Sequence, residues 1–288
     1  MLNKPPYLSK QLISDFIQRA LKEDIGPGDY SSLASLDKNA KGAATLQIKE
    51  SGILAGVEVA LEVFRQIDAN LSLDVYMEDG SSVEEGDIVL EVNGKAQSIL
   101  SAERLALNIL QRMSGIATKT ANLSKLIAHT SCRLLDTRKT TPNFRMFEKW
   151  AVLLGGGQNH RYALYDMIML KDNHIDYAGG ILNAVERTRA FLEAANLELK
   201  IEVETRTLEE VNEAIKAEVN IILLDNMSTE MLKQGVDLVA GKCQTEASGG
   251  ITEETIVQIA ETGVDFISVG ALTHSYKSLD MSLKASIK

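Results

Sequence analysis

The sequence from about residue 113 onward alternates short apolar segments with segments of helical periodicity. Six of the apolar segments read as strands that finish on polar or glycine residues: RLLDTRK (133–139), MIMLKDNH (167–174), KIEVE (200–204), IILLD (221–225), QTEASGG (244–250) and FISVGA (266–271). The helical segments between the later strands are residues 207–217, 229–240 and 252–262. Continuous apolar strands that alternate with helices are typical of a parallel sheet. This many units in so short a stretch favour a closed or nearly closed β/α barrel over an open sheet, and no GxGxxG motif follows any strand.

The first 112 residues follow a different pattern. Residues 11–23 carry apolar side chains at helical spacing, and a Gly-Pro-Gly break comes soon after them. Strand-like segments then follow, separated by Gly-Asp and Asn-Gly turns. The change of pattern indicates two domains, for which a chain of 288 residues is long enough.

The charge of the chain is unevenly distributed. Its net charge of −10 argues against general binding to nucleic acids or anionic membranes, which requires a basic surface. Residues 133–171 nevertheless hold seven basic against three acidic side chains, a local charge of +4. The basic residues are Arg133, Arg138, Lys139, Arg145, Lys149, Arg161 and Lys171. Such a basic island indicates a local site for anions; the alternative is a solvated helix face, in which evenly mixed signs would be expected.

Two further features bear on the compartment. Cys132 and Cys243 lie 111 positions apart without a metal-binding partner motif, which is typical of free thiols in a reducing environment. The first residues, MLNKPPYLSK, contain two prolines where a signal peptide would be apolar. No apolar run approaches the ~20 residues that a membrane span requires. We therefore expect a cytoplasmic protein.

Polar and glycine residues gather where the predicted strands end, and the carboxyl ends of the strands are where β/α barrels place their active sites. These residues are Asp136, Thr137, Arg138, Lys139, Lys171, Asp172, Glu204, Asp225, Ser248, Gly249, Gly250, Gly270 and Ala271. The bases among them, together with Arg161 and the neighbouring His160, suit a ligand with several carboxylates or phosphates.

A carboxylate pair and two glycine clusters complete this edge. Glu204 and Asp225 end consecutive strands, which lie ~4.8 Å apart, so both can flank one ligand. They could hold Mg²⁺, accept hydrogen bonds from sugar hydroxyls or stabilise a developing positive charge, and the alternative is structural salt bridges to the bases. Ser248-Gly249-Gly250 and Val269-Gly270-Ala271 end the last two strands, where many β/α barrels bind phosphate through backbone N–H groups. A phosphorylated sugar that meets an acidic acceptor would fit this combination.

The sequence resembles the quinolinate phosphoribosyltransferase family in a series of strings at matching spacing, from about residue 100 to 280. The strings are SAERLALNILQRMSGIAT, LLDTRKTTP, GGGQNHR, LKDNHI, IEVE, IILLDNM, EASGGIT and ETGVDFISVGALTHS. The segment EDIGPGDYSS extends the resemblance weakly into the first domain. Two departures, Asn143 where glycine often stands and Thr-Arg-Thr after Glu204, do not touch an expected contact.

The resemblance implies an α/β fold with an N-terminal α/β sandwich domain and an incomplete parallel β/α barrel. We place the sandwich domain at residues 1–112, with the tail 275–288 packing back on it, and the catalytic barrel domain at residues 113–274. The resemblance also implies a homodimer or higher homo-oligomer in which Arg104 reaches into the partner subunit's active site.

The activity that the resemblance implies is transfer of phosphoribosyl from phosphoribosyl pyrophosphate to quinolinate with decarboxylation, a step of NAD biosynthesis that requires Mg²⁺. Arg138, His160, Arg161 and Lys171 match residues around the two carboxylates of quinolinate. Lys139, Glu204 and Asp225 match residues that contact phosphoribosyl pyrophosphate and its Mg²⁺, with Thr137 as a further substrate contact. Ser248, Gly249 and Gly250, together with Val269, Gly270 and Ala271, match the cradle of the 5′-phosphate. We expect Lys139, Lys171, Glu204 and Asp225 to be catalytic.

Three alternatives differ in class. A related transferase, such as the molybdenum-operon paralogue or a nicotinate phosphoribosyltransferase, would share the fold, but a mono-acid acceptor should need fewer bases. A phosphosugar isomerase or aldolase on the same barrel is a second alternative, and an aldolase would use Lys171 as a Schiff-base lysine. A ligand-binding module would bind phosphoribosyl pyrophosphate without consuming it, and the acid pair argues against that.

Overall fold

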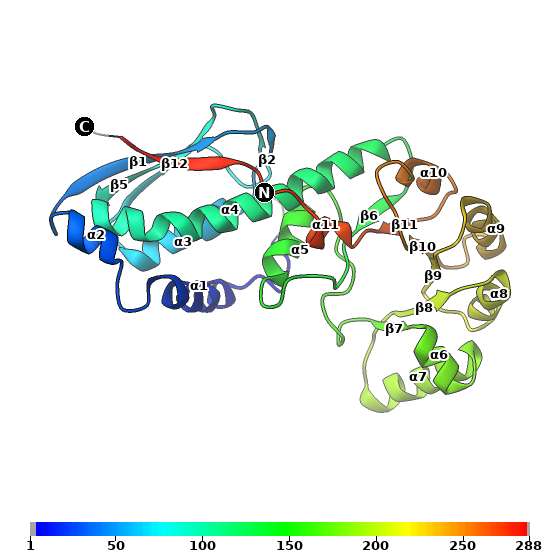
Figure 1. Ribbon diagram of the computed structural model, residues 1–288. Helices are drawn as coiled ribbons and strands as arrows, with labels where there is room; N and C mark the ends of the chain where they lie inside the picture. Colours follow the sequence, from blue (N-terminus) through cyan, green and yellow to red (C-terminus); the bar gives the residue numbers. More distant parts are fainter. Residues whose placement is uncertain (1–3, 287–288) are drawn as a thin grey trace. The chain divides into compact units, whose positions relative to one another are not determined.

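The computed structural model describes residues 4–286, which divide into two compact units (Figure 1). The first unit comprises the described residues up to Ala121, the segment Thr140–Gly156 and the described residues from Leu272 onward. The second unit comprises Asn122–Lys139 and Gly157–Ala271.

These bounds differ from the predicted ranges 1–112 and 113–274. The helix α4 (Ala96–Leu126) carries the chain past residue 112 without a break, so no change of structure marks the predicted boundary. Thr140–Gly156, which contains α5 (Arg145–Leu154), belongs with the first unit although it lies between two barrel strands in the sequence.

The first unit is built on a four-stranded antiparallel sheet in the order β12-β1-β5-β3. Its strands are β1 (Lys41–Ile48), β3 (Ser72–Val75), β5 (Ile88–Lys95) and β12 (Met281–Ser286). Strand β12 belongs to the tail of the chain and pairs antiparallel with β1, Leu283 opposite Leu46. A separate two-stranded pair joins β2 (Gly52–Ile53) and β4 (Ser82–Val83).

Helices cover one side of this sheet (Figure 1). Apolar side chains of the sheet, such as Leu46 and Leu90, meet those of α3 (Val57–Ile67) and α4 in a buried layer. The α4 side chains in that layer, Ala106, Leu107 and Leu110, recur at the spacing of one helix face. The remaining helices of the unit are α1 (Lys10–Ile25), α2 (Tyr30–Ser35), α5 and α11 (Ala271–His274), the last of which begins on the final residue of the second unit.

The second unit is built on six parallel strands in the order β6-β11-β10-β9-β8-β7. They are β6 (Arg133–Leu135), β7 (Ile168–Leu170), β8 (Ile201–Thr205), β9 (Ile221–Asp225), β10 (Gln244–Ser248) and β11 (Phe266–Ser268). Strands β6 and β7 are the two edges and do not pair with each other, so the barrel is open. The predicted incomplete parallel β/α barrel is confirmed.

Several predicted strands are longer than the observed ones. Strand β6 stops at Leu135 and β7 at Leu170, so the polar strings DTRK and KDNH lie beyond the sheet. The same holds for the glycine-rich ends of the segments that form β10 and β11. The apolar residues pair in the sheet, whereas the polar and glycine residues turn away at its carboxyl edge and form loops or begin a helix.

The helices of the second unit lie along the outer side of its strands (Figure 1). They are α6 (Asp172–Ala178), α7 (Ile181–Ala195), α8 (Leu208–Lys216), α9 (Thr229–Val239) and α10 (Ile256–Ala260). The hydroxyl of Thr207 caps α8 by accepting the N–H of Glu210, and that of Ser228 caps α9 in the same way.

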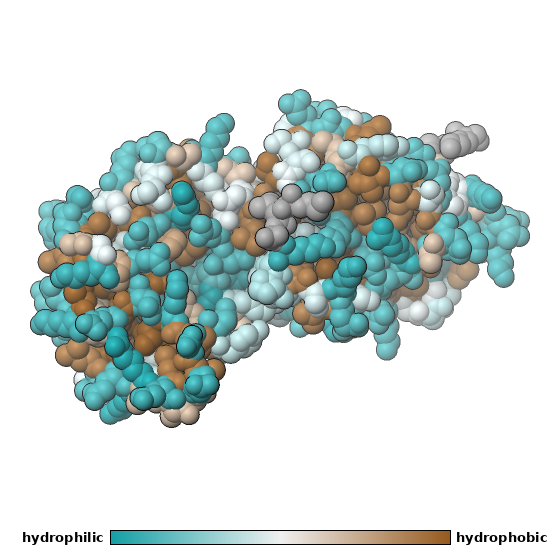
Figure 2. Space-filling view, turned by 180° about the vertical axis from the view of Figure 1, so that it is seen from behind, coloured by the Kyte–Doolittle hydropathy of each residue, from teal (hydrophilic) through white to brown (hydrophobic). Residues whose placement is uncertain are grey.

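Polar side chains cover most of the face of each unit that Figure 2 presents, with apolar side chains scattered among them. Within residues 4–286, no helix combines the length and the apolar character that crossing a membrane requires. The cytoplasmic location stays a prediction. Both cysteines are free thiols, and burial, reinforced by Asp265, raises the pKa of Cys132 to about 12.

Candidate active site at the carboxyl edge of the parallel sheet

Asp225, the last residue of β9, is held by two neighbours. Ser248 is the last residue of β10 and lies directly opposite Asp225 in the register of the two strands. The Ser248 hydroxyl donates a hydrogen bond of 2.6 Å to Oδ1 of Asp225, and Nδ2 of Asn226 donates one of 2.7 Å to Oδ2. Because both carboxylate oxygens accept a hydrogen bond, the orientation of the Asp225 side chain is fixed by the fold.

Glu204 lies on β8, next to β9, and faces Lys171. The ammonium of Lys171 is 3.9 Å from Oε2 of Glu204, and the Lys171 side chain is half exposed at the start of α6. Burial raises the pKa of Glu204, the charge of Lys171 opposes that shift, and the charge of Asp225 reinforces it. The edge therefore presents two carboxylates that repel each other and one half-exposed ammonium beside them.

This donor set fits the Mg²⁺ ion that the sequence resemblance implies. Mg²⁺ takes oxygen ligands and is commonly bound by one or two carboxylates together with water and the phosphate oxygens of a substrate. Glu204 and Asp225 supply two such carboxylates on neighbouring strand ends, and their mutual repulsion would be relieved by a cation. On donor chemistry the two residues could hold the ion.

Two arginines form the basic part of the site. Burial lowers the pKa of Arg161, and the positive charge of Arg138 lowers it further. Arg161 is half-buried, and its Nη1 donates to the carbonyl oxygen of Met167 at 3.3 Å. Two guanidinium groups near each other suit a ligand with more than one carboxylate. In the loop that follows β6, the hydroxyl of Thr137 accepts the N–H of Lys139, whose own side chain is exposed.

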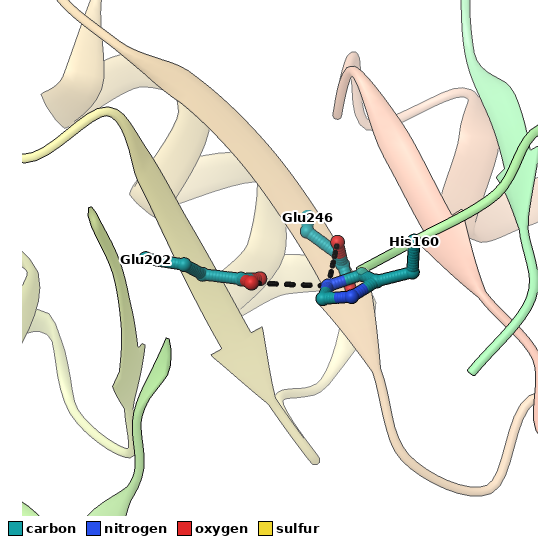
Figure 3. A group of neighbouring side chains, drawn as sticks. All are labelled: His160, Glu202 and Glu246. Carbon is teal, nitrogen blue, oxygen red and sulfur yellow. Dashed lines mark ion pairs between the residues drawn. The ribbon is translucent and has the colours of Figure 1, made fainter. Parts of the chain in front are cut away.

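The ring of His160 lies between two buried glutamates that belong to strands of the parallel sheet (Figure 3). Its Nε2 is 3.0 Å from Oε2 of Glu202 on β8 and 3.4 Å from Oε2 of Glu246 on β10. Its Nδ1 accepts the backbone N–H of Arg161 at 2.8 Å. Among the described residues, His160, Glu202 and Glu246 form a group whose ligand atoms lie within 4.8 Å of one another, a spacing at which they could hold a metal ion.

The protons of this cluster follow from its contacts. Burial disfavours the charged form of His160, but pairing with Glu202 and Glu246 outweighs burial and raises the pKa of His160 to about 10. A doubly protonated ring, however, could not accept the Arg161 N–H at Nδ1. The hydrogen bond at Nδ1 therefore places the ring proton on Nε2, between the two glutamates, and burial raises the pKa of Glu202.

The glycine segments occupy the adjoining strand ends. Gly249 and Gly250 have φ angles of +97° and +60°, in the region that favours glycine, and a Cβ on Gly249 would overlap the side chain of Asn226. The N–H of Val269 donates to the carbonyl oxygen of Leu135, which extends the pairing of β11 with β6. Gly270 and Ala271 follow directly, where α11 begins.

The second unit thus brings the expected site residues to the carboxyl edge of its strands, with one exception. The residues gathered there are Thr137, Arg138, Lys139, Arg161, Lys171, Glu204, Asp225, Ser248, Gly249, Gly250, Gly270 and Ala271, with Val269 and His160 more deeply buried. Arg104 belongs to the first unit, where it is an exposed residue of α4.

Sequence reasoning missed Glu202 and Glu246 as members of this region. Each is a glutamate within an apolar strand, and each is no more than 1% exposed. Glu202 precedes Glu204 by two residues and Glu246 precedes Ser248 by two, so in each strand the pair shares one face. A charged residue in a buried strand, two positions before a site residue, was the available signal.

The comparisons with known proteins cover both units. The family model for the quinolinate phosphoribosyl transferase N-terminal domain matches residues 29–114, and that for the C-terminal domain matches residues 116–284. A chloroplastic nicotinate-nucleotide pyrophosphorylase [carboxylating] of Oryza sativa subsp. japonica is 46% identical over 97% of this chain and 79% of its own. A probable nicotinate-nucleotide pyrophosphorylase [carboxylating] of Bacillus subtilis is 41% identical over 96% and 93% of the two chains. The crystal structure of NadC from Streptococcus pyogenes is similar with a TM-score of 0.92, at 43% identity over 97% of this chain and 98% of that one. The chain belongs to the quinolinate phosphoribosyltransferase family.

Proposed function

We propose that this chain transfers the phosphoribosyl group of phosphoribosyl pyrophosphate to quinolinate and releases pyrophosphate and CO₂, so that nicotinate mononucleotide is formed for NAD biosynthesis. The observation that carries the proposal is the match of both domains to one family, whose relatives are named as carboxylating nicotinate-nucleotide pyrophosphorylases. The arrangement of an acid pair beside a basic cluster supports it, because the reaction joins a phosphorylated sugar to a di-acid.

The basic residues would bind the acceptor. Arg138, Arg161 and Lys171 would pair with the two carboxylates of quinolinate, with His160 close behind them, and Arg104 of the partner subunit would complete the pocket in a homodimer or larger assembly. A di-anionic acceptor offers enough charge to offset several bases, whereas a mono-acid would leave part of that charge uncompensated.

The acid pair and the glycine segments would bind the donor. Glu204 and Asp225 would hold Mg²⁺, largely through substrate and water, and the bound ion would supply positive charge beside the pyrophosphate. The segments 248–250 and 269–271 would cradle the 5′-phosphate through backbone N–H groups, while Thr137 and Lys139 would lie beside the pyrophosphate.

The residues would then act by electrostatics, without a covalent nucleophile. Lys139 and Lys171 stabilise the departing pyrophosphate as its bond to C1 of the ribose breaks. Glu204 and Asp225 offset the positive charge that C1 acquires, and the ring nitrogen of quinolinate attacks C1. The pyridinium formed in this way accepts the electron pair of the neighbouring C–CO₂ bond, CO₂ leaves, and a proton replaces it on the ring.

The test is an assay on purified protein with Mg²⁺, phosphoribosyl pyrophosphate and quinolinate, in which pyrophosphate, CO₂ and nicotinate mononucleotide are measured together, with nicotinate as a parallel acceptor. Equal amounts of the three products from quinolinate support the proposal. Turnover of nicotinate alone would overturn the substrate, and turnover of neither would favour the paralogous transferase. Substitution of Glu204 and of Asp225 by alanine should each abolish most of the activity, and turnover within a few-fold of wild type in both would refute their assigned roles.

The sharing of Arg104 is tested by mixing subunits. Arg104→Ala and Lys171→Ala proteins should each be inactive alone. If the two residues serve one site from different subunits, mixed dimers contain one intact site, and partial activity should return. An absence of recovery after demonstrated subunit exchange would count against a shared site.

A further inference from the structure

Three buried acidic side chains in the second unit converge on one short segment, Asn159–His160. Asp136, Glu202 and Glu246 follow or belong to three different strands, and each is at most 1% exposed. The interior of a β/α barrel is normally filled with branched apolar side chains. Burying a carboxylate costs free energy unless a partner compensates it. Three buried carboxylates around one segment therefore indicate that they hold this segment by polar contacts, which apolar side chains cannot make.

The contacts of Asp136 fix the backbone of this segment. Its Oδ1 accepts the N–H of His160 at 2.9 Å, and its Oδ2 accepts Nδ2 of Asn159 at 2.6 Å. In addition, Gln158 pairs with Leu135 as an isolated parallel bridge, which ties the segment to the open edge of the sheet at β6. The chain just before Arg161 is thereby held by both backbone and side-chain hydrogen bonds.

The contacts of the glutamates fix the ring of His160. Glu202 and Glu246 approach Nε2 from β8 and β10 (Figure 3). Nδ1 accepts the backbone N–H of Arg161. Nδ1 therefore has its hydrogen bond within the protein, and Nε2 lies at ion-pair distance from two buried carboxylates. In this arrangement the imidazole connects two strands to the backbone of Arg161.

From this geometry we infer that Glu202, Glu246 and Asp136 are positioning residues, which lock His160 and through it hold Arg161 in place for binding a carboxylate of the acceptor. The inference rests on the proposed function, because it takes Arg161 as an acceptor-binding residue. It gives His160 the role of a buried support for Arg161, in addition to the contact with quinolinate that the sequence resemblance implies.

The kinetic test uses Glu202→Leu and Glu246→Leu, which remove the carboxylates beside Nε2 of His160, and Glu202→Gln and Glu246→Gln, which keep an oxygen at the same place. Misplacing Arg161 should raise KM for quinolinate by roughly tenfold to a hundredfold in the leucine variants, with KM for phosphoribosyl pyrophosphate changed by less than about twofold. The glutamine variants should recover most of the loss. The matched control is Thr245→Val, a buried polar residue on β10 beside Glu246 that bonds to Asp265 and faces the other side of the sheet. It should leave both KM values unchanged even if it lowers the melting temperature.

A second readout does not depend on turnover. The chain has four histidines, so ¹⁵N NMR of the imidazole nitrogens can be assigned with His160→Gln. The wild-type spectrum should show His160 protonated at Nε2 and not at Nδ1, with and without quinolinate. In the leucine variants the Nε–H signal of Arg161, identified by Arg161→Lys, should shift or broaden.

The outcomes separate the inference from the proposed function. If the wild-type protein does not turn over quinolinate but the NMR results are as expected, the proposed function fails while the support of Arg161 by this cluster stands. If the wild-type protein turns over quinolinate and the variants change both KM values equally, or if Nδ1 gains a proton when quinolinate binds, the positioning role is overturned. A stoichiometric metal ion in the purified protein that is lost in the Glu246→Gln variant would overturn it as well, because Nε2 would then be a ligand.

Discussion

The hydroxyl of Ser248 and the carboxylate of Asp225 form a 2.6 Å hydrogen bond across the carboxyl ends of two neighbouring parallel strands. A hydrogen bond to a charged group contributes ~1.5–3 kcal/mol, so this one keeps Asp225 in a single orientation. Ser248→Ala should therefore lower kcat/KM for phosphoribosyl pyrophosphate by roughly tenfold or more. Steady-state kinetics at saturating quinolinate measures the effect.

The control for this prediction is Ser35→Ala, which removes a hydroxyl bonded to a backbone carbonyl in α2 of the first unit. Its kinetic constants should match those of the wild type. If Ser248→Ala had the same kcat/KM as Ser35→Ala, the support of Asp225 by Ser248 would have no part in the reaction.

Lys171 should matter for activity and hardly at all for stability. Its side chain is 51% exposed, and its nearest carboxylate, on Glu204, is 3.9 Å away, which is a weak ion pair. Lys171→Met should change the free energy of unfolding by less than about 0.5 kcal/mol, as expected for an exposed pair. Activity should fall by roughly a hundredfold or more, because the charge would be missing where negative charge develops.

Urea unfolding and turnover of the same preparation test both parts of this prediction. Lys233→Met is the matched variant, since Lys233 is similarly exposed and pairs with Asp237 on α9. It should behave like Lys171→Met in urea and like the wild type in the assay. A large loss of stability in Lys171→Met alone would mean that the pair with Glu204 is structural.

Arg112 should be a major determinant of stability within the first unit. Its Nε donates at 3.1 Å to the fully buried carboxylate of Glu148, and its guanidinium lies 5.2 Å and 4.9 Å from the ring centroids of Phe144 and Tyr276. Arg112→Met would leave the Glu148 charge buried without this partner, which should cost about 3–5 kcal/mol of unfolding free energy.

Chemical denaturation measures that loss, and the double variant Arg112→Met, Glu148→Gln is the informative comparison. Removing the charge of Glu148 should restore part of the stability, while its backbone partner, the N–H of Thr141, keeps an acceptor. If the double variant were less stable than Arg112→Met by the full cost of a second independent substitution, the two residues would not be coupled.

Gly115 should not tolerate a side chain. A Cβ at this position of α4 would lie 2.2 Å from the carbonyl oxygen of Lys277, where the tail of the chain crosses the helix on its way to β12. Gly115→Ala should therefore destabilise the protein by about 1–3 kcal/mol, since backbone must move to admit the methyl group.

Gly42→Ala is the control for this prediction, because its Cβ would meet Ala96 at 3.5 Å from the Cβ and 3.8 Å from the Cα, which are ordinary contacts. Thermal unfolding should show a clear drop in Tm for Gly115→Ala and a small change for Gly42→Ala. Equal melting temperatures for the two variants would mean that the tail can leave α4 at no cost.

Much of the second unit could be predicted because its signals are local. Strand β9 was predicted with its observed bounds, 221–225, and α8 and α9 within one residue at each end. The ends of β6 and β7 were placed too late, because a polar string such as DTRK continues an apolar run in the sequence while the hydrogen bonds of the sheet stop before it. A boundary at residue 112 was drawn from a change of pattern, although α4 crosses that position.

The sequence by itself determined the alternation of strand and helix, the family, and the placement of Lys171, Glu204, Asp225 and the glycines at or just beyond the carboxyl ends of strands, since each follows from periodicity or short motifs. Only the tertiary structure decided which of these side chains touch one another and what lies beneath them. Glu202 and Glu246 are 44 positions apart in the chain, and no local sequence pattern predicts that both glutamates meet the ring of His160. Their meeting depends on the order of strands in the sheet, because β9 must separate β8 from β10 for one imidazole to lie between the two glutamates.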